Sequence, residues 1–276
     1  MPARTLLLAP HFATGVDPRH NALRRTLARD EPAFGVLDNT YSPAAVEVVG
    51  ELGFDFVWID LEHGGPSPWD ADALADLLRA AELTDTELLV RIPEANPSMV
   101  RKALDAGVRN VFLSRVESAA EVRDALAAAN FEYDGSPGRR GLAGPRSARY
   151  GLADDYVGTE DEEICLGVTV ETVEAVENID EILSVPELGF AFLGPNDFSV
   201  AYGSPGDVGD PEVQAAVETV HDAALARDVT LGGLTFGMDD VVEKVERDYQ
   251  LLHVGSTLGA LTKTFGDWHG RYDDAR

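Results

Sequence analysis

Residues 53–65 read Gly-Phe-Asp-Phe-Val-Trp-Ile-Asp-Leu-Glu-His-Gly-Gly, an apolar strand with a charged end. The run 54–61 is short and mostly apolar, which is typical of a strand covered by helices in a parallel sheet. Asp60, Glu62 and His63 close it, and ionisable side chains at that density do not pack a core. We therefore expect a buried strand whose carboxyl end carries chemistry.

Seven similar apolar runs occur along the chain and alternate with helical patterns. The expected strands are 34–37, 54–61, 88–92, 111–116, 166–170, 190–193, 230–235 and 251–254. The expected helices are 42–52, 69–82, 97–106, 118–130, 172–183, 211–227 and 239–248. This alternation predicts βαβ units and a parallel sheet.

Eight strands in 276 residues predict an α/β fold of the (β/α)8 TIM barrel type, for which about 250 residues is typical. We expect one barrel domain over 21–276 and an N-terminal extension over 1–20. A doubly wound open sheet is the alternative. Its dinucleotide-binding form is disfavoured, because no Gly-x-Gly-x-x-Gly follows the first strand.

The composition is strongly acidic, with a net charge of −27 and a pI near 4.4. This charge excludes nucleic acid and anionic membranes as expected partners. It predicts adaptation to high salt, where self-repulsion is screened. No apolar run reaches the roughly 18 residues of a membrane span, and the N-terminal apolar stretch is too short for a signal peptide. We expect a soluble cytoplasmic protein.

Candidate functional residues stand at strand ends, which line the active site of a barrel. Arg91 lies inside the apolar run 88–92 and needs an anionic partner there. His63 is a natural proton carrier near neutral pH. Glu171 and Asp197 follow neighbouring strands, and two carboxylates with water suit Mg²⁺, or Mn²⁺ or Co²⁺.

Two further segments are candidates for ligand contact. The turn Gly194-Pro195-Asn196 exposes backbone N–H groups that can hold a carboxylate. The long connection 131–159 concentrates arginine in an acidic protein, at Arg139, Arg140, Arg146 and Arg149. It is interpreted either as a solvated surface loop or as a substrate or subunit contact.

A Schiff-base mechanism is disfavoured. It needs a desolvated lysine on a strand, and the three lysines of the chain, Lys102, Lys244 and Lys263, lie outside every expected strand.

These motifs together resemble the HpcH/HpaI aldolase family of class II 2-keto acid aldolases. The resemblance runs from about Asn21 to about Gly259. It rests on segments 53–64, 89–93 (Leu-Val-Arg-Ile-Pro), 104–107 (Leu-Asp-Ala-Gly), 171–183 and 193–199 (Leu-Gly-Pro-Asn-Asp-Phe-Ser). It implies a phosphoenolpyruvate/pyruvate-type barrel that reversibly cleaves a 4-hydroxy-2-keto acid to pyruvate and an aldehyde. It also implies a homo-hexamer, built as a trimer of dimers with swapped C-terminal helices.

The resemblance implies a role for each matching residue. Glu171 and Asp197 match the metal-binding carboxylates. His63 matches the catalytic base, Asp105 its dyad partner, and Asp60 a further acid of the same cluster.

Two further matches concern the substrate. Arg91 matches the arginine that holds the pyruvyl oxygen. The segment from Gly194 through Asn196 to Asp197 matches the one that meets the pyruvate carboxylate. Thr169 departs from the glutamine common in the family.

Two other readings of the same residues remain open. A citrate lyase β-like or malyl-CoA-type lyase would share the barrel, the metal carboxylates and the arginine. A non-catalytic barrel subunit would show neither pyruvate release nor activity sensitive to chelation.

Overall fold

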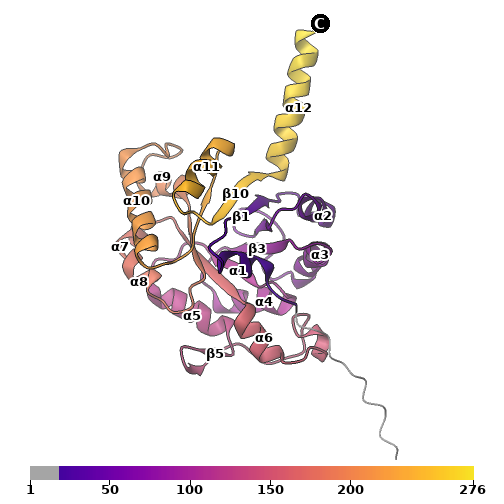
Figure 1. The fold of residues 1–276 in the computed structure, drawn as a ribbon, viewed down its shortest axis with the longest axis vertical. Helices are drawn as coiled ribbons and strands as arrows, with labels where there is room; N and C mark the ends of the chain where they lie inside the picture. The colour runs from indigo at the N-terminus through magenta and orange to yellow at the C-terminus, as the bar shows by residue number, and fades with distance from the viewer. Residues whose placement is uncertain (1–18) are drawn as a thin grey trace, which may run out of the picture.

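The computed structural model describes residues 19–276 (Figure 1). Its central sheet is a closed parallel barrel with the strand order β1-β10-β9-β8-β7-β4-β3-β2. The strands are β1 (Ala33–Leu37), β2 (Phe56–Asp60), β3 (Glu87–Ile92), β4 (Asn110–Leu113), β7 (Cys165–Val170), β8 (Phe190–Leu193), β9 (Leu231–Leu234) and β10 (Leu251–Ser256). The predicted (β/α)8 barrel is confirmed. The predicted extension 1–20 lies outside the described residues, apart from 19 and 20.

Helices surround the barrel, and each predicted helix is present. They are α1 (Ala22–Leu27), α2 (Pro43–Glu51), α3 (Ala71–Ala81), α4 (Pro97–Ala106), α5 (Ala119–Ala129), α6 (Tyr156–Glu163), α7 (Val173–Glu177), α8 (Ile179–Leu183), α9 (Pro195–Ala201), α10 (Pro211–Ala226), α11 (Met238–Glu246) and α12 (Thr257–Asp274). The predicted helix 172–183 is divided at Asn178 into α7 and α8. The strand and helix pattern of the sequence did not include α1, α6, α9 and α12, although the family resemblance implied a C-terminal helix.

The barrel lumen is filled by layers of side chains. One layer comes from the alternate strands β2, β4, β8 and β10, and consists of Trp58, Phe112, Phe192 and His253. Ring centroids of Trp58 lie 5.4 Å from Phe112, 5.6 Å from Phe192 and 5.4 Å from His253. Four side chains from alternate strands are the usual layer of a TIM barrel.

Glycines on the intervening strands make room for the large rings. A Cβ on Gly35 of β1 would stand 2.2 Å from the ring of Phe56, and one on Gly167 of β7 would stand 2.4 Å from Phe190. Both distances are shorter than any van der Waals contact. The lumen is therefore a packed core rather than a pore.

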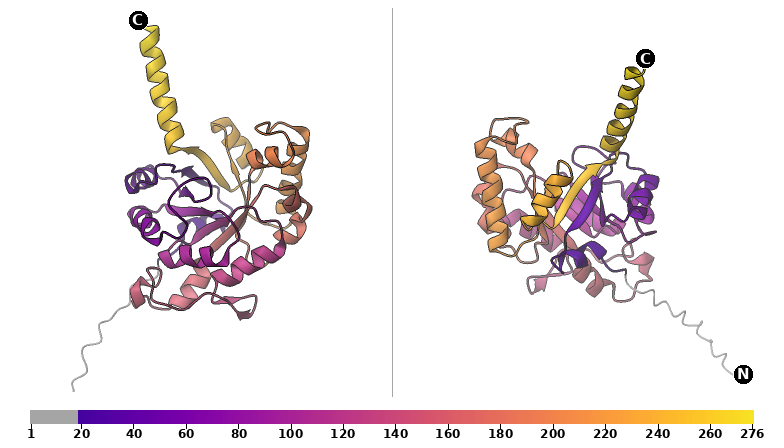
Figure 2. Two further views of the ribbon diagram at one scale, coloured as in Figure 1. Left: turned by 180° about the vertical axis from the view of Figure 1, so that it is seen from behind. Right: turned by 45° about the horizontal axis from the view of Figure 1, so that its top comes forward.

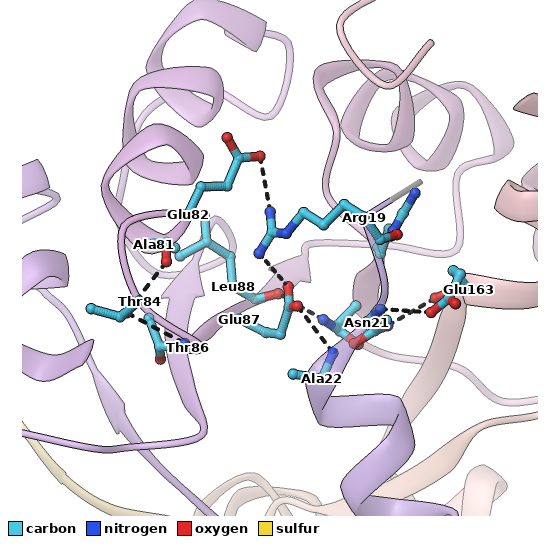
Figure 3. Close-up of polar contacts among 12 residues, drawn as sticks. Arg19, Asn21, Ala22, Ala81, Glu82, Thr84, Thr86, Glu87, Leu88 and Glu163 are labelled. Atoms are coloured by element: carbon cyan, nitrogen blue, oxygen red, sulfur yellow. Dashed lines mark hydrogen bonds and ion pairs between the residues drawn. The ribbon is translucent and has the colours of Figure 1, made fainter. Parts of the chain in front are cut away.

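The end of the barrel where the strands begin is closed by α1 and a buried polar network (Figure 3). Leu23 of α1 is buried and packs in the lumen cluster. Asn21 caps the helix, and its Nδ2 donates to Oδ1 of Asn110 at 2.7 Å. Glu163 accepts from the Asn21 N–H at 2.6 Å, and Glu87 accepts from the Ala22 N–H at 3.1 Å. Hydrogen bonds thus satisfy the polar groups that the closure buries.

The last helix, α12, continues from the carboxyl end of β10 and stands away from the barrel in each view (Figures 1 and 2). Ser256 caps it, and Thr257 at its base donates to Oδ1 of Asp38 at 2.9 Å. It is the longest of the described helices, at 18 residues. Neither α12 nor any other helix in residues 19–276 is both long and apolar enough to cross a membrane.

Candidate active site

Arg91 and Asp60 form a bidentate ion pair at the carboxyl ends of β3 and β2. Nε of Arg91 donates to Oδ1 of Asp60 at 2.9 Å, and Nη2 donates to Oδ2 at 2.6 Å. Burial alone would raise the pKa of Asp60, but the hydrogen bonds and charge of Arg91 outweigh burial and hold the pKa below its usual range. The anionic partner that the sequence required for Arg91 is therefore Asp60, which leaves N–H groups of Nη1 and Nη2 for other acceptors.

Glu171 follows β7 and lies in a group of acids. Its Oε1 accepts from the backbone N–H of Arg115 at 2.7 Å, whereas its Oε2 is buried without a hydrogen-bond partner among residues 19–276. Burial raises the pKa of Glu171 to about 7, and the charges of Glu62 and Asp197 add to the rise. The structure thus brings Glu171, Asp197 and Arg91 near one another, as the sequence predicted.

Glu62 joins this group, although the sequence interpretation assigned it no role. Its Oε2 accepts from Oγ of Ser114 at 2.7 Å and lies 3.1 Å from Nη1 of Arg91. The same oxygen lies 3.6 Å from Nε2 of His63. The His63 side chain is 60% exposed, so its ring is at the rim of the mouth and open to a ligand.

Residues 194–197 are the start of a helix rather than a free turn. Pro195 is the first residue of α9, so the N–H groups of Asn196 and Asp197 lie in its first turn, where a helix leaves them unpaired. Gly194 packs against Glu171, because a Cβ there would stand 3.2 Å from Cβ of Glu171. Asn196 is exposed, and Asp197 is partly buried.

Within one chain, Asp105 is not brought to His63, so the expected dyad stays a prediction that involves two subunits. It lies at the carboxyl end of α4, which runs back from the mouth to the start of β4. Its backbone carbonyl accepts from the Ser147 N–H at 3.2 Å. Burial raises the pKa of Asp105, and the charge of Arg140 opposes that rise. A pairing with His63 would need Asp105 from another subunit.

The arginine-rich connection 131–159 also lies at the end of the barrel where the strands begin, on the side opposite the mouth. Arg140 lies over the rings of Phe131 and Tyr156, at 5.1 and 5.6 Å, and its Nη2 donates to Oε2 of Glu160 at 2.9 Å. Arg109 holds the other oxygen of Glu160 at 2.6 Å. Within one chain, Arg140 is thus buried at the end of the barrel where the strands begin, while most of the connection is exposed or partly exposed.

The residues at the mouth fit a divalent cation. A buried carboxylate with one oxygen lacking a partner, beside two further acids, is stabilised by a positive charge. Glu171 and Asp197 offer the hard oxygen ligands that Mg²⁺ prefers. Glu62 is already committed to Ser114 and Arg91, so Glu171 and Asp197 are the residues that would hold the ion.

Another set of three ligand atoms lies on α10, from the exposed Glu218 and Asp222 and the buried His221, all within 4.8 Å of one another. Glu218 is already paired with Arg247 at 2.7 Å, and Nε2 of His221 with the Arg247 carbonyl at 2.9 Å. These contacts are those of a structural surface network. We assign no metal to it.

The comparison with known proteins shows the family of the chain. The sequence profile of the HpcH/HpaI aldolase/citrate lyase family matches residues 35–264. The chain belongs to this family. The resemblance expected from the sequence is therefore confirmed, and the HpcH/HpaI membership identifies an enzyme of the carbon–carbon lyase class.

Individual HpcH/HpaI relatives show how far the similarity reaches. A hydroxypyruvate/pyruvate aldolase of Paraburkholderia phytofirmans is 33% identical over 83% of this chain and 87% of its own length. A 2-keto-3-deoxy-L-rhamnonate aldolase of Klebsiella pneumoniae is 32% identical over 72% of this chain and 73% of its own. The crystal structure of a family protein from Burkholderia cenocepacia superimposes with a TM-score of 0.86, at 29% identity, over 92% of this chain and 99% of its own.

Proposed function

We propose that the protein is a metal-dependent class II aldolase that reversibly cleaves a 4-hydroxy-2-keto acid to pyruvate and an aldehyde. The observation that carries this proposal is the environment of Glu171: a buried carboxylate with a free oxygen, next to Asp197 and to the acid-paired Arg91. The names of the aldolase relatives support a pyruvate-type substrate.

The chain's own residues would bind the 2-keto acid. A divalent ion held by Glu171 and Asp197 would supply Lewis-acid polarisation of the keto group. The free N–H groups of Arg91 would donate to the keto oxygen, where negative charge develops as the carbon–carbon bond breaks. The N–H groups of Asn196 and Asp197 would hold the carboxylate, because a helix N-terminus favours an anion.

His63 would take the proton of the 4-hydroxyl group during cleavage. Its ring is open to the mouth, and Glu62 at 3.6 Å can orient it. Asp60 fixes Arg91 through two hydrogen bonds and would act as a positioning acid. Asp105 would reach His63 only across a subunit contact.

We propose a homo-oligomer, with the predicted hexamer as its form. Apolar side chains of α12 that are each 46–60% exposed recur at heptad-like spacing: Leu258, Leu261, Phe265, Trp268 and Tyr272. Such a stripe on a helix that stands away from its own barrel needs a partner surface. Removing 257–276 is expected to reduce the molar mass measured by light scattering in high salt.

The test of function is pyruvate release from a panel of 2-keto-3-deoxy sugar acids in high salt, with Mg²⁺ and with EDTA. Activity is expected with Mg²⁺ and not with EDTA. Glu171→Gln is expected to lower turnover by at least about 10²-fold, and His63→Ala by about 10²- to 10⁴-fold. Lys263→Gln on exposed α12 is the matched surface control.

The other outcomes separate the alternative functions. Cleavage of a CoA thioester without pyruvate release would identify a citrate lyase-like enzyme. No cleavage of any substrate, with or without metal, would identify a non-catalytic barrel.

A further inference from the structure

The guanidinium of Arg91 rests on the ring of Trp58. Its Cζ lies 5.0 Å from the ring centroid, within the range of a cation–π interaction, and Trp is the strongest aromatic partner for such a contact. Asp60 holds Arg91 by its edge through two hydrogen bonds. The hydrogen bonds to Asp60 fix the plane of the guanidinium, and the contact with Trp58 fixes its distance from the layer of rings in the lumen.

Trp58 is itself fixed by its layer of the lumen. It is 5% exposed, and its ring meets Phe112 and Phe192 in edge contacts. On a third side lies His253, whose ring is nearly perpendicular to the indole, at 86°. The indole therefore has little freedom to move away from Arg91.

His253 completes the layer as a neutral ring. Its two ring nitrogens are buried and have no hydrogen-bond partner among the described residues. Burial lowers the pKa of His253 to about 4, so that the ring carries no charge at neutral pH. A charged imidazole here would place a second cation beside the indole and compete with Arg91 for it.

We propose that Trp58 is a positioning residue for the lyase reaction, and that its ring, packed against His253, holds Arg91 where its N–H groups meet the keto oxygen. This inference rests on the proposed function of Arg91. It adds that two side chains which do not touch the substrate, Trp58 and His253, hold the arginine in place.

The test measures deuterium exchange at C3 of pyruvate and pyruvate affinity, with Mg²⁺ in high salt. Trp58→Leu removes the π face and is expected to lower exchange by about 3- to 30-fold, the range of one cation–π contact. Trp58→Phe keeps a face and is expected to lose less than about 3-fold. Phe190→Leu removes an aromatic ring from the layer below and serves as the matched control, with nearly wild-type exchange.

A double-mutant cycle separates positioning from general damage to the core. In an Arg91→Gln background no cation is present, so Trp58→Leu is expected to cause no further loss of pyruvate affinity. Equal loss in both backgrounds would overturn the inference, as would equal exchange in Trp58→Leu and Phe190→Leu. Wild-type exchange in Arg91→Gln alone would instead refute the proposed function of Arg91, and with it the basis of this inference.

Discussion

The unpaired imidazole of His253 makes a specific prediction about stability and pH. Its pKa falls from the ordinary 6.5 to about 4 because the folded barrel buries the ring. As pH drops through 6.5, the unfolded chain binds a proton at this site and the folded protein does not. The contribution of His253 to the free energy of unfolding is therefore fully present above pH 6.5 and is lost as the pH falls to 4. The total change is about 3 kcal/mol.

In metal-free protein, Glu171 changes the free energy of unfolding with pH in the opposite direction. Its folded pKa of about 7 exceeds the ordinary 4.5, so its contribution is present below pH 4.5 and is lost as pH rises through 7. Because the two effects are of similar size, we expect the wild-type free energy of unfolding to change little from these sites between pH 5 and 6.5. The substitution His253→Phe removes the contribution of His253, so that the pH dependence due to Glu171 can be measured.

The assay is urea unfolding followed by circular dichroism, in high salt with EDTA, at pH 5 and pH 8. Relative to wild type, His253→Phe is expected to gain about 2 kcal/mol more at pH 5 than at pH 8. Adding Glu171→Gln to both proteins should leave that gain unchanged. The same difference between variant and wild type at the two pH values would show that His253 does not titrate as its burial requires.

Three other predictions follow from packing and charge. In Gly194→Ala the new Cβ would meet Glu171 at 3.2 Å, so affinity for Mg²⁺ measured by calorimetry should fall by about 10-fold; unchanged affinity would mean that this contact does not position the carboxylate. Glu160 is 1% exposed and paired with both Arg109 and Arg140, so Glu160→Gln should lower the free energy of unfolding by about 3 kcal/mol, and a loss under about 1 kcal/mol in urea unfolding would contradict this. The net charge of −27 predicts that the melting temperature rises by about 5 °C or more between 0.1 and 2 M KCl, whereas a flat curve would remove the argument for adaptation to salt.

The barrel was predictable because most of its strands, such as β2, β3, β4, β7 and β8, are buried on both faces. Each of these strands is therefore a continuous apolar run, and its helix follows with caps such as Ser118 and Asn96. Among the missed helices, α1 and α12 have caps at Asn21 and Ser256, so other features hid them. The six-residue α1 and the seven-residue α9 are too short for periodicity. Helix α12 carries glycines, and its apolar stripe faces no part of its own barrel.

The site was predictable where a charged residue interrupts or ends a strand, as at Arg91 and Glu171. Glu62 could have been predicted from the same signal, because it lies in the ionisable run that ends the second strand. Arg115 was not, because it acts through its backbone N–H, which donates to Glu171. Residue type carries no information about such a contact.

The place of Asp105 within one chain was not predictable from the motif around it. Its sequence neighbours predict the end of a helix, and the structure has that end. A helix that follows a barrel strand returns to the other side of the barrel, so its last residue is far from the strand ends that form the mouth. Topology therefore separates Asp105 from His63, whatever the motif around it.

Because α1 and its asparagine and glutamate partners close one end of the barrel, substrate and products can enter and leave only at the other end. With the lumen packed by aromatic rings and its lower end closed, the proposed lyase must load and unload both fragments on one side. The fragment bound deeper, against Arg91 and Glu171, has to depart after the one nearer the rim. Pyruvate should then compete with the full-length substrate, whereas the aldehyde should inhibit without competing.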